Sequence, residues 1–358
     1  MHVRFLSGGF ELSATIRDVA RRAGVSIKTV SRVLNGSPRV TEDTRQRVMA
    51  AIDALDFHPN AAARALVLRK SRTIGLVIAD ITNPFFPEIV RGVEDVANRH
   101  NYNVILCNTD ENPDKERCYI NLIREKQGDG IILAGSRIGA DEVVALARKG
   151  IHVVVINGDV RHPRVGVVAV ANEERAHEAV SHLARMGHTR IAYISGSPMS
   201  SSNAERLQGY RRGHDDNGIP LDESLVVQAG PTREGGFAAM SCLLNIPAWP
   251  TAILAYNDLQ AIGAMEAIKE HGLTVPRDIA VIGFDDIQLA SFTTPPLTTF
   301  RMPKYEMGMR AAEMLIGMII SRTVRESRLV VDPELVIRES CGYRQSVLTR
   351  GTMAAGRR

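Results

Sequence analysis

Residues 14–36 read ATIRDVARRAGVSIKTVSRVLNG. Thr15 and Asp18 have the spacing of a capping box, in which a hydroxyl and a carboxylate satisfy free amides at a helix start. Apolar residues follow at helical spacing until Gly24, a residue suited to ending a helix, and Ser26 is suited to capping the next one. The stretch therefore predicts two short helices joined by a glycine turn.

A third helix is predicted after these two. Thr41 can cap it, and Val48, Ile52 and Leu55 have the spacing of one inward face. Two short helices joined by a glycine turn and braced by a third are typical of a helix-turn-helix module. In its second helix the apolar positions face the core, which leaves four side chains pointing outward: Ile27, Lys28, Ser31 and Arg32.

The positive charge of the chain is concentrated around this module. Residues 1–72 hold 13 Lys and Arg against 6 Asp and Glu, whereas the whole chain holds 44 against 40. A basic head on a near-neutral body favours a polyanionic partner. Lys28 and Arg32 are four residues apart and can reach neighbouring bases in a major groove. The alternative is a solvated basic surface on a small helical bundle.

Longer motifs in this region resemble the head of the LacI/GalR family of bacterial transcription repressors. They are DVA from Asp18, AGVS from Ala23, TVSRVLN from Thr29, and Pro59-Asn60. The resemblance implies that Ile27, Lys28 and Arg32 read bases, while hydroxyls and helix-start amides meet phosphates. The residues that we predict to contact DNA are Thr15, Ser26, Ile27, Lys28, Thr29, Ser31, Arg32, Asn35, Thr41, Asn60, Ala63 and Leu66.

An alanine-rich segment follows the module. Residues 60–69 are long enough for two or three helical turns, which is too short for a stable isolated helix. The resemblance implies a hinge helix that orders on operator DNA, where a leucine from each of two subunits wedges into the minor groove. Leu66 matches that leucine, and Ala63 leaves room for close approach. Alternatively, Leu66 opens the core of the next domain.

From Thr73 onward, strand-like apolar runs alternate with helical stretches. The runs are TIGLVIA, NVILCN, GIILAG, HVVVIN, VGVVAV, RIAYISG, LVVQAG, TAILAY and IAVIGF. This alternation predicts parallel sheets covered on both faces, and the number of runs predicts two sheets. With the resemblance, the expected fold is an N-terminal all-α helix-turn-helix head plus an α/β, periplasmic-binding-protein-like core of two doubly wound parallel-sheet subdomains.

The predicted boundaries follow from this plan. They are a disordered tail (1–13), the DNA-binding domain (14–58), a hinge (59–72), the core (73–345) and a second tail (346–358). Within the core, 73–173 and 302–327 are assigned to the first subdomain, and 174–301 and 328–345 to the second. The resemblance implies that members which tetramerise do so through a C-terminal leucine zipper. Because the last tail has no leucine heptads, we expect only a homodimer.

Candidate ligand-binding residues follow the predicted strands, because parallel sheets bind ligands beyond their carboxyl ends. The resemblance selects Phe85, Phe86, Arg206, Asn257, Asp258 and Asp285. Each has an ordinary alternative: Asp258 as a helix cap, Asp285 as a turn residue, Arg206 paired with Glu205 or Asp215, and the phenylalanines as core. Asp, Asn and Arg suit the hydroxyls of a sugar, and an aromatic ring can stack on its apolar side.

We predict a sugar or sugar acid as the ligand, but two departures from the family mean that its specificity cannot be copied from a known member. Asn157-Gly158 stands where many relatives have Asp-Arg, and Pro231 where several have an aromatic ring. A purine-type ligand ranks lower because only Phe85 or Phe86 is placed to stack on it.

Other function classes lack sequence support. The chain has no GxxxxGK[ST], GxSxG or HExxH motif, no membrane-length apolar run and no secretory signal, and its four cysteines lack metal-ligand spacing. We therefore expect no enzyme activity, no cofactor, no metal and no membrane partner. The resemblance implies a cytoplasmic repressor of pseudo-palindromic operator DNA that is controlled by a small effector. The alternatives are an activator or corepressor-requiring regulator of the same family, and a stand-alone sugar-binding protein.

Overall fold

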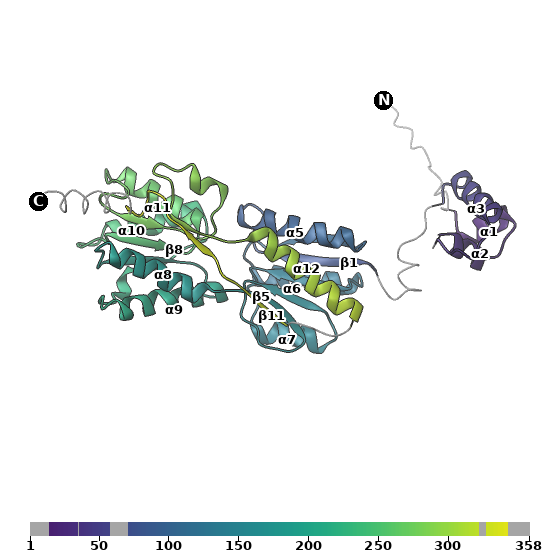
Figure 1. Ribbon diagram of the computed structural model, residues 1–358, viewed down its shortest axis with the longest axis horizontal. Coiled ribbons are helices and arrows are strands. Elements are labelled where there is room, and N and C mark those ends of the chain that lie inside the picture. Colours follow the sequence, from purple (N-terminus) through teal and green to yellow (C-terminus); the bar gives the residue numbers. More distant parts are fainter. Residues whose placement is uncertain (1–13, 35, 58–70, 322–326, 343–358) are drawn as a thin grey trace, which may run out of the picture. The chain divides into compact units, whose positions relative to one another are not determined.

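The computed structural model describes residues 14–34, 36–57, 71–321 and 327–342. The chain divides into two compact units, residues 1–71 and 72–358 (Figure 1). The first unit is helical, and the second is built from parallel sheets and helices. No helix within the described ranges is long and apolar enough to cross a membrane.

The helical unit has the three helices that the sequence predicts. They are α1 (Ile16–Ala23), α2 (Ile27–Leu34) and α3 (Glu42–Ala54). At the start of α1 the Asp18 carboxylate accepts hydrogen bonds from the backbone N–H of Thr15 (3.0 Å) and from its hydroxyl (2.6 Å). Gly24 ends α1 with φ +64°, a conformation that glycine adopts without strain.

One valine from each helix holds this unit together. Val19, Val30 and Val48 are all fully buried and belong to a single core cluster that also contains Phe57. Burying a valine side chain contributes roughly 1.5–3 kcal/mol. Because α2 directs Val30 and Val33 into this core, its opposite face is left to solvent.

The first subdomain of the larger unit is built on a six-stranded parallel sheet. In spatial order its strands are β11 (Arg328–Val331), β5 (Val165–Val170), β4 (Val153–Ile156), β3 (Gly130–Ala134), β1 (Thr73–Ile78) and β2 (Asn103–Asn108). Its helices are α5 (Phe85–Arg99) and α12 (Lys304–Ser321) on one face and α6 (Pro113–Glu125) and α7 (Ala140–Arg148) on the other. β3, β4 and β5 are buried at every position, as expected for strands covered on both faces.

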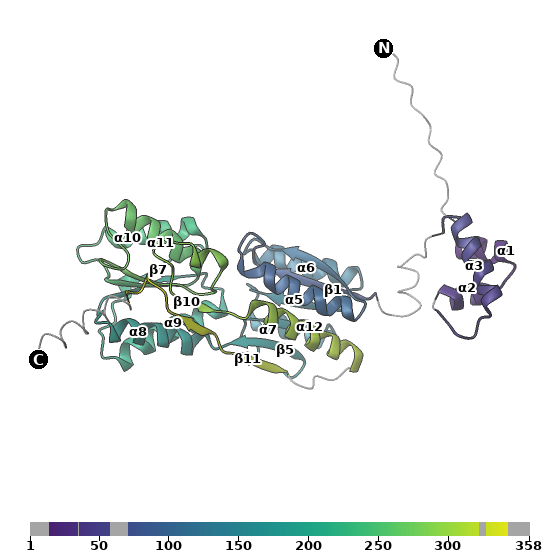
Figure 2. The same cartoon turned by 45° about the horizontal axis from the view of Figure 1, so that its top comes forward.

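The second subdomain is built on a four-stranded parallel sheet. Its strands in spatial order are β7 (Val226–Gln228), β6 (Ile191–Ser195), β8 (Ala252–Ala255) and β9 (Ala280–Ile282). One face is covered by α8 (Asn172–Arg185) and α9 (Ser201–Asp216), the other by α10 (Arg233–Leu244) and α11 (Asp258–Glu270) (Figure 2). Short 3-10 helices, η1 (Glu223–Leu225) and η2 (Gln288–Ser291), lie in its loops. The predicted fold class is confirmed, and all nine predicted runs form strands.

The chain passes between the subdomains more than once. β10 (Thr299–Arg301) and β12 (Glu334–Val336) pair antiparallel, and α12 between them returns to pack on α5. The assignment of residues 328–331 to the second subdomain was wrong, because β11 pairs in parallel with β5. α12 delivers the chain beside the open edge of β5, whose unpaired backbone groups a further strand can satisfy.

Helices α5 and α12 approach closely through two glycines. A Cβ on Gly308 would lie 2.2 Å from the Ile89 carbonyl oxygen, and one on Gly92 would lie 2.2 Å from that of Tyr305. Only glycine leaves the room for these contacts. The pair fixes α12, which begins at Lys304 next to the crossover strands, against the helix that begins at Phe85.

Candidate nucleic-acid interface and ligand pocket

The exposed face of α2 carries the base-reading residues predicted from the sequence. Lys28 and Arg32 are exposed, and Ile27 is 45% exposed, which is unusual for a large apolar side chain at a helix start. Thr29 and Ser31 are half-buried beside them. An exposed surface with two cations and one apolar side chain has the chemistry needed to contact guanine edges and thymine methyl groups.

Hydroxyl groups mark the helix starts of the same unit. Ser26 Oγ accepts the backbone N–H of Thr29 (3.1 Å), so Ser26 caps α2 as predicted. Thr15 and Thr41 are the N-cap residues of α1 and α3, and both are exposed. Backbone N–H groups at such starts favour phosphate. The remaining predicted DNA contacts lie outside the described residues: Asn35, Asn60, Ala63 and Leu66.

A pocket lies between the two subdomains of the larger unit, lined by residues that follow the carboxyl ends of the strands or begin the next helices. From the first subdomain these are Asn83, Phe85, Phe86, Glu111, Gly135, Arg137 and Asn157. From the second they are Ser202, Arg206, Pro231, Tyr256, Asn257 and Asp285. Open parallel sheets bind ligands at this edge, so the topology makes this the candidate binding site.

The pocket is narrow. Its free space is about 30 Å³, and by this measure a water molecule needs about 10–15 Å³. The space therefore holds a few waters and is too small for a sugar ring. A ligand of that size enters only when the subdomains move apart or the lining side chains swing aside.

Arg206 is the most buried cation of the pocket, at 2% exposed. Its Nε donates to Asn172 Oδ1 (2.9 Å), and its Nη1 donates to the Tyr256 carbonyl oxygen. The guanidinium also lies 3.9 Å from the centre of the Phe284 ring, an attractive cation–π arrangement. Arg206 is therefore held rigidly at the pocket wall, and no ion pair between it and Glu205 or Asp215 occurs among the described side chains.

Asp285 is 6% exposed, and its carboxylate accepts no hydrogen bond from the described residues. Burial raises the pKa of Asp285 to about 6, while the charges of Arg206 and Lys304 oppose that rise. Its φ of +111° is rare for a residue with a side chain, and such strain is concentrated at functional sites. A buried carboxylate that lines a pocket without a partner is suited to accept hydrogen bonds from a ligand.

Asn257 and Asp258 follow β8 but have different environments. Asn257 lines the pocket, caps α11 through the Gln260 N–H (2.9 Å) and donates to the Pro231 carbonyl oxygen (2.9 Å). Asp258 is fully buried and does not line the pocket. Its carboxylate accepts the Thr299 hydroxyl (2.5 Å) and the Ile287 N–H (2.9 Å), which ties down the turn containing Asp285.

The two phenylalanines combine core and pocket positions. Phe85 and Phe86 are 6% and 5% exposed, belong to the core under α5, and line the pocket. Their rings meet edge to face, with centroids 5.2 Å apart. The two phenylalanines are therefore both core residues and pocket-lining residues.

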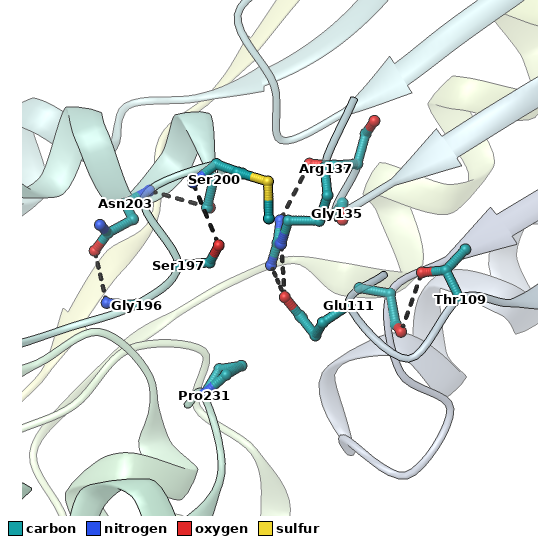
Figure 3. Close-up of polar contacts among 12 residues, drawn as sticks. Thr109, Glu111, Gly135, Arg137, Gly196, Ser197, Ser200, Asn203 and Pro231 are labelled. Atoms are coloured by element: carbon teal, nitrogen blue, oxygen red, sulfur yellow. Dashed lines mark hydrogen bonds and ion pairs between the residues drawn. The ribbon is translucent and has the colours of Figure 1, made fainter. Parts of the chain in front are cut away.

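The pocket also contains charged residues that the sequence analysis did not single out. Arg137 follows β3 and Glu111 follows β2, and they form an ion pair across 2.6 Å (Figure 3). Tyr256 lines the opposite wall, with its hydroxyl next to Ser202 Oγ at 3.1 Å. The rule of inspecting every strand end, applied to GIILAG and NVILCN as well, would have found Arg137 and Glu111.

Known proteins share both units. Residues 15–60 match the family model described as bacterial regulatory proteins, lacI family, and residues 180–341 match that of a periplasmic binding protein-like domain. The catabolite control protein A of Priestia megaterium is 36% identical over 330 residues, which covers 92% of this chain and 99% of that protein.

Solved structures agree with these matches. The lac repressor dimer bound to operator and an anti-inducer superposes with a TM-score of 0.82 at 27% identity, covering 92% of this chain and 99% of the other. A transcriptional regulator CelR–cellobiose complex superposes with a TM-score of 0.69 at 31% identity, covering 91% and 99%. The chain therefore belongs to the lacI family of bacterial regulatory proteins, and it is a transcriptional repressor of that type, with a DNA-binding head and a ligand-binding core.

Proposed function

We propose that this chain is a homodimeric repressor that binds a pseudo-palindromic operator through α2 and releases it when a sugar binds between the two core subdomains. The observation that carries the proposal is Asp285, a buried carboxylate to which no described residue donates a hydrogen bond, and which lines the pocket together with Arg206. A sugar hydroxyl can donate to one of these groups and accept from the other.

On the DNA side, Ile27, Lys28 and Arg32 are proposed to read bases from the exposed face of α2. The hydroxyl residues at the helix starts position the head on phosphates. Leu66, which lies outside the described residues, is proposed to wedge into the central minor groove. Replacing Leu66 with Ala should then weaken operator binding far more than binding to random DNA.

On the effector side, Arg206, Asn257 and Asp285 are proposed to hold ligand hydroxyls, with Phe85 or Phe86 against an apolar ring face. Asp258 is proposed to act indirectly by anchoring the turn that carries Asp285. The cellobiose bound by the CelR relative supports a sugar as the ligand class.

Entry of a sugar requires the pocket to widen beyond about 30 Å³, and we propose that the subdomains move apart to admit it, which couples binding to that movement. A coupling free energy of about 1–3 kcal/mol between effector and operator changes operator affinity roughly 5–150-fold. We propose that the protein works in the cytoplasm, where its DNA partner lies, and that it catalyses no reaction.

Fluorescence anisotropy on a labelled palindromic duplex with a CpG centre tests the proposal, with a scrambled duplex as reference at about 150 mM salt. We expect preferential binding that one sugar of a panel abolishes, and we expect Asp285→Asn to keep operator binding but lose the sugar response. Preference that appears only after a sugar is added would replace induction by corepression. Equal binding to both duplexes with every sugar would reject the repressor function on this operator class.

A further inference from the structure

Two charged residues of the pocket, Glu111 and Arg137, remain outside the proposed hydroxyl-binding set. Both come from loops of the first subdomain, and Figure 3 shows them facing the second subdomain's Ser197, Ser200 and Pro231 across the pocket. Arg137 is 7% exposed, and the Glu111 side chain is 26% exposed. Their position in the wall means that they meet any ligand bound there.

The guanidinium of Arg137 is almost fully engaged by the protein itself. Its Nε donates to Glu111 Oε2 (2.6 Å), and its Nη2 lies 2.6 Å from the same oxygen. Its Nη1 donates to the carbonyl oxygens of Gly135 and Ser136, both at 3.1 Å. A guanidinium has five N–H groups, so no adjacent pair of donors is left to grip a ligand carboxylate or phosphate.

Glu111 offers the opposite kind of group. Both contacts from Arg137 go to Oε2, and Oε1 accepts no hydrogen bond from the described residues. The main chain of Glu111 is held by its N–H, which donates to the Ala79 carbonyl oxygen (3.0 Å), and the two contacts with Arg137 orient its carboxylate. The pair therefore presents a hydrogen-bond acceptor to the pocket without adding net charge.

The charges that line the pocket balance. Arg137 is matched by Glu111, and above pH 6 Arg206 is matched by Asp285. A ligand that brings its own negative charge would enter a buried site without a surplus cation, which is unfavourable. A ligand with hydroxyl groups alone finds two carboxylates as acceptors and the guanidinium of Arg206 as a donor.

We propose that Glu111 neutralises Arg137 and thereby makes the pocket select a neutral polyhydroxylated effector over the carboxylate or phosphate derivative of the same sugar. This inference rests on the proposed effector site and narrows the expected ligand from a sugar or sugar acid to a neutral sugar. Glu111 and Arg137 are then specificity-determining residues of that site.

The test measures binding of matched pairs to the full-length protein by isothermal titration calorimetry. The pairs are glucose with glucose 6-phosphate, galactose with galacturonate, and ribose with ribose 5-phosphate. We expect the wild-type protein to bind at least one neutral member ten times or more tightly than its acidic partner. Glu111→Gln keeps the size of the side chain but leaves the charge of Arg137 uncompensated. The ratio of the affinity for the neutral sugar to the affinity for its acidic partner should therefore fall at least tenfold in this variant.

A matched control separates local from overall charge. Glu125→Gln makes the same charge change at an exposed position at the end of α6 and should leave the ratio unchanged. Tighter binding of an acidic member to the wild type, or an equal ratio in wild type and Glu111→Gln, would overturn the inference while leaving a sugar-responsive repressor intact. If the protein prefers the neutral sugars but their binding leaves operator affinity unchanged, the inference is supported and the proposed function is contradicted. No binding of any pair to either protein would overturn both.

Discussion

The Nζ of Lys304 donates a 2.9 Å hydrogen bond to the backbone carbonyl oxygen of Asp285. Lys304 begins α12 of the first subdomain and is 4% exposed, whereas Asp285 lies in the pocket wall of the second. The same Nζ donates to the Asp286 carbonyl oxygen (3.0 Å) and lies 3.4 Å from Glu88 Oε1 on α5. One cation therefore connects the ligand-binding turn to the two closely packed helices of the other subdomain.

Removing this cation should alter the pocket's response to pH. In Lys304→Met the pKa of Asp285 should rise, because Lys304 is one of the two charges that oppose the effect of burial. The carbonyl oxygens of Asp285 and of the half-buried Asp286 also lose a donor, which should lower the unfolding free energy by about 1 kcal/mol for each hydrogen bond lost. Effector titrations from pH 5 to 8 should show the midpoint of the affinity change moving to higher pH.

Arg310→Met is the control for Lys304→Met, since it removes an exposed cation from the same helix. It should leave the midpoint in place. A Lys304→Met protein with the wild-type midpoint would mean that Lys304 does not act on Asp285.

The pKa of Asp285 itself predicts a pH dependence with a definite sign. Burial raises this pKa to about 6, from about 3.9 in an unfolded chain. The native state thus binds more protons between pH 4 and 6, so this group lowers the unfolding free energy as pH rises through that window. Effector affinity should instead rise with pH, because the ionised carboxylate is the better hydrogen-bond acceptor. Below pH 6 the affinity should fall about tenfold for each pH unit.

Calorimetric titration of the wild type across pH 5–8 measures the affinity, and urea unfolding of wild type and Asp285→Asn measures the stability. The variant should lose the part of the stability change between pH 4 and 6 that Asp285 contributes, while the buried Asp258, whose pKa is also raised by burial, still contributes its own part. A wild-type affinity that stays constant from pH 5 to pH 7 would exclude ionised Asp285 as a ligand contact.

Two glycines of α12 should respond oppositely to the same substitution. Gly308→Ala places a Cβ 2.2 Å from the Ile89 carbonyl oxygen, so α5 and α12 must separate, and the overpacking should cost about 1–3 kcal/mol. Gly317→Ala meets nothing within 4 Å in the same helix and should stabilise the protein by about 0.4–1 kcal/mol. Thermal unfolding of both variants measures the difference, and equal melting temperatures would contradict the close packing.

The exposed face of α2 should determine which DNA sequence is bound. Arg32→Ala should weaken operator binding by about 1–3 kcal/mol if its guanidinium grips a guanine, while binding to scrambled DNA should fall much less. Arg148→Ala removes an exposed arginine from α7 in the other unit and should leave both affinities unchanged. Anisotropy with the two duplexes measures this, and equal losses on both in Arg32→Ala would assign Arg32 to a phosphate contact.

The sequence alone predicted the order and type of the elements, because those depend on local periodicity and caps. Thr15, Gly24 and Ser26 mark helix ends whose geometry involves residues only a few positions away. The nine apolar runs predicted buried parallel strands for a similar reason, since a strand covered on both faces must be apolar throughout. The rule that ligands lie beyond strand ends then led to Arg206, Asn257 and Asp285.

Tertiary structure decided which strand-end residues share the pocket and which charges meet there. Asp258 and Asp285 both follow strands, yet only the fold directs Asp258 toward Thr299, 41 residues away, and leaves the Asp285 carboxylate without a hydrogen-bond donor among the described residues. The Glu111–Arg137 pair and the place of β11 beside β5 likewise depend on segments distant in sequence. Local patterns carry no information about such contacts, because they are set by how the sheets and helices pack against one another.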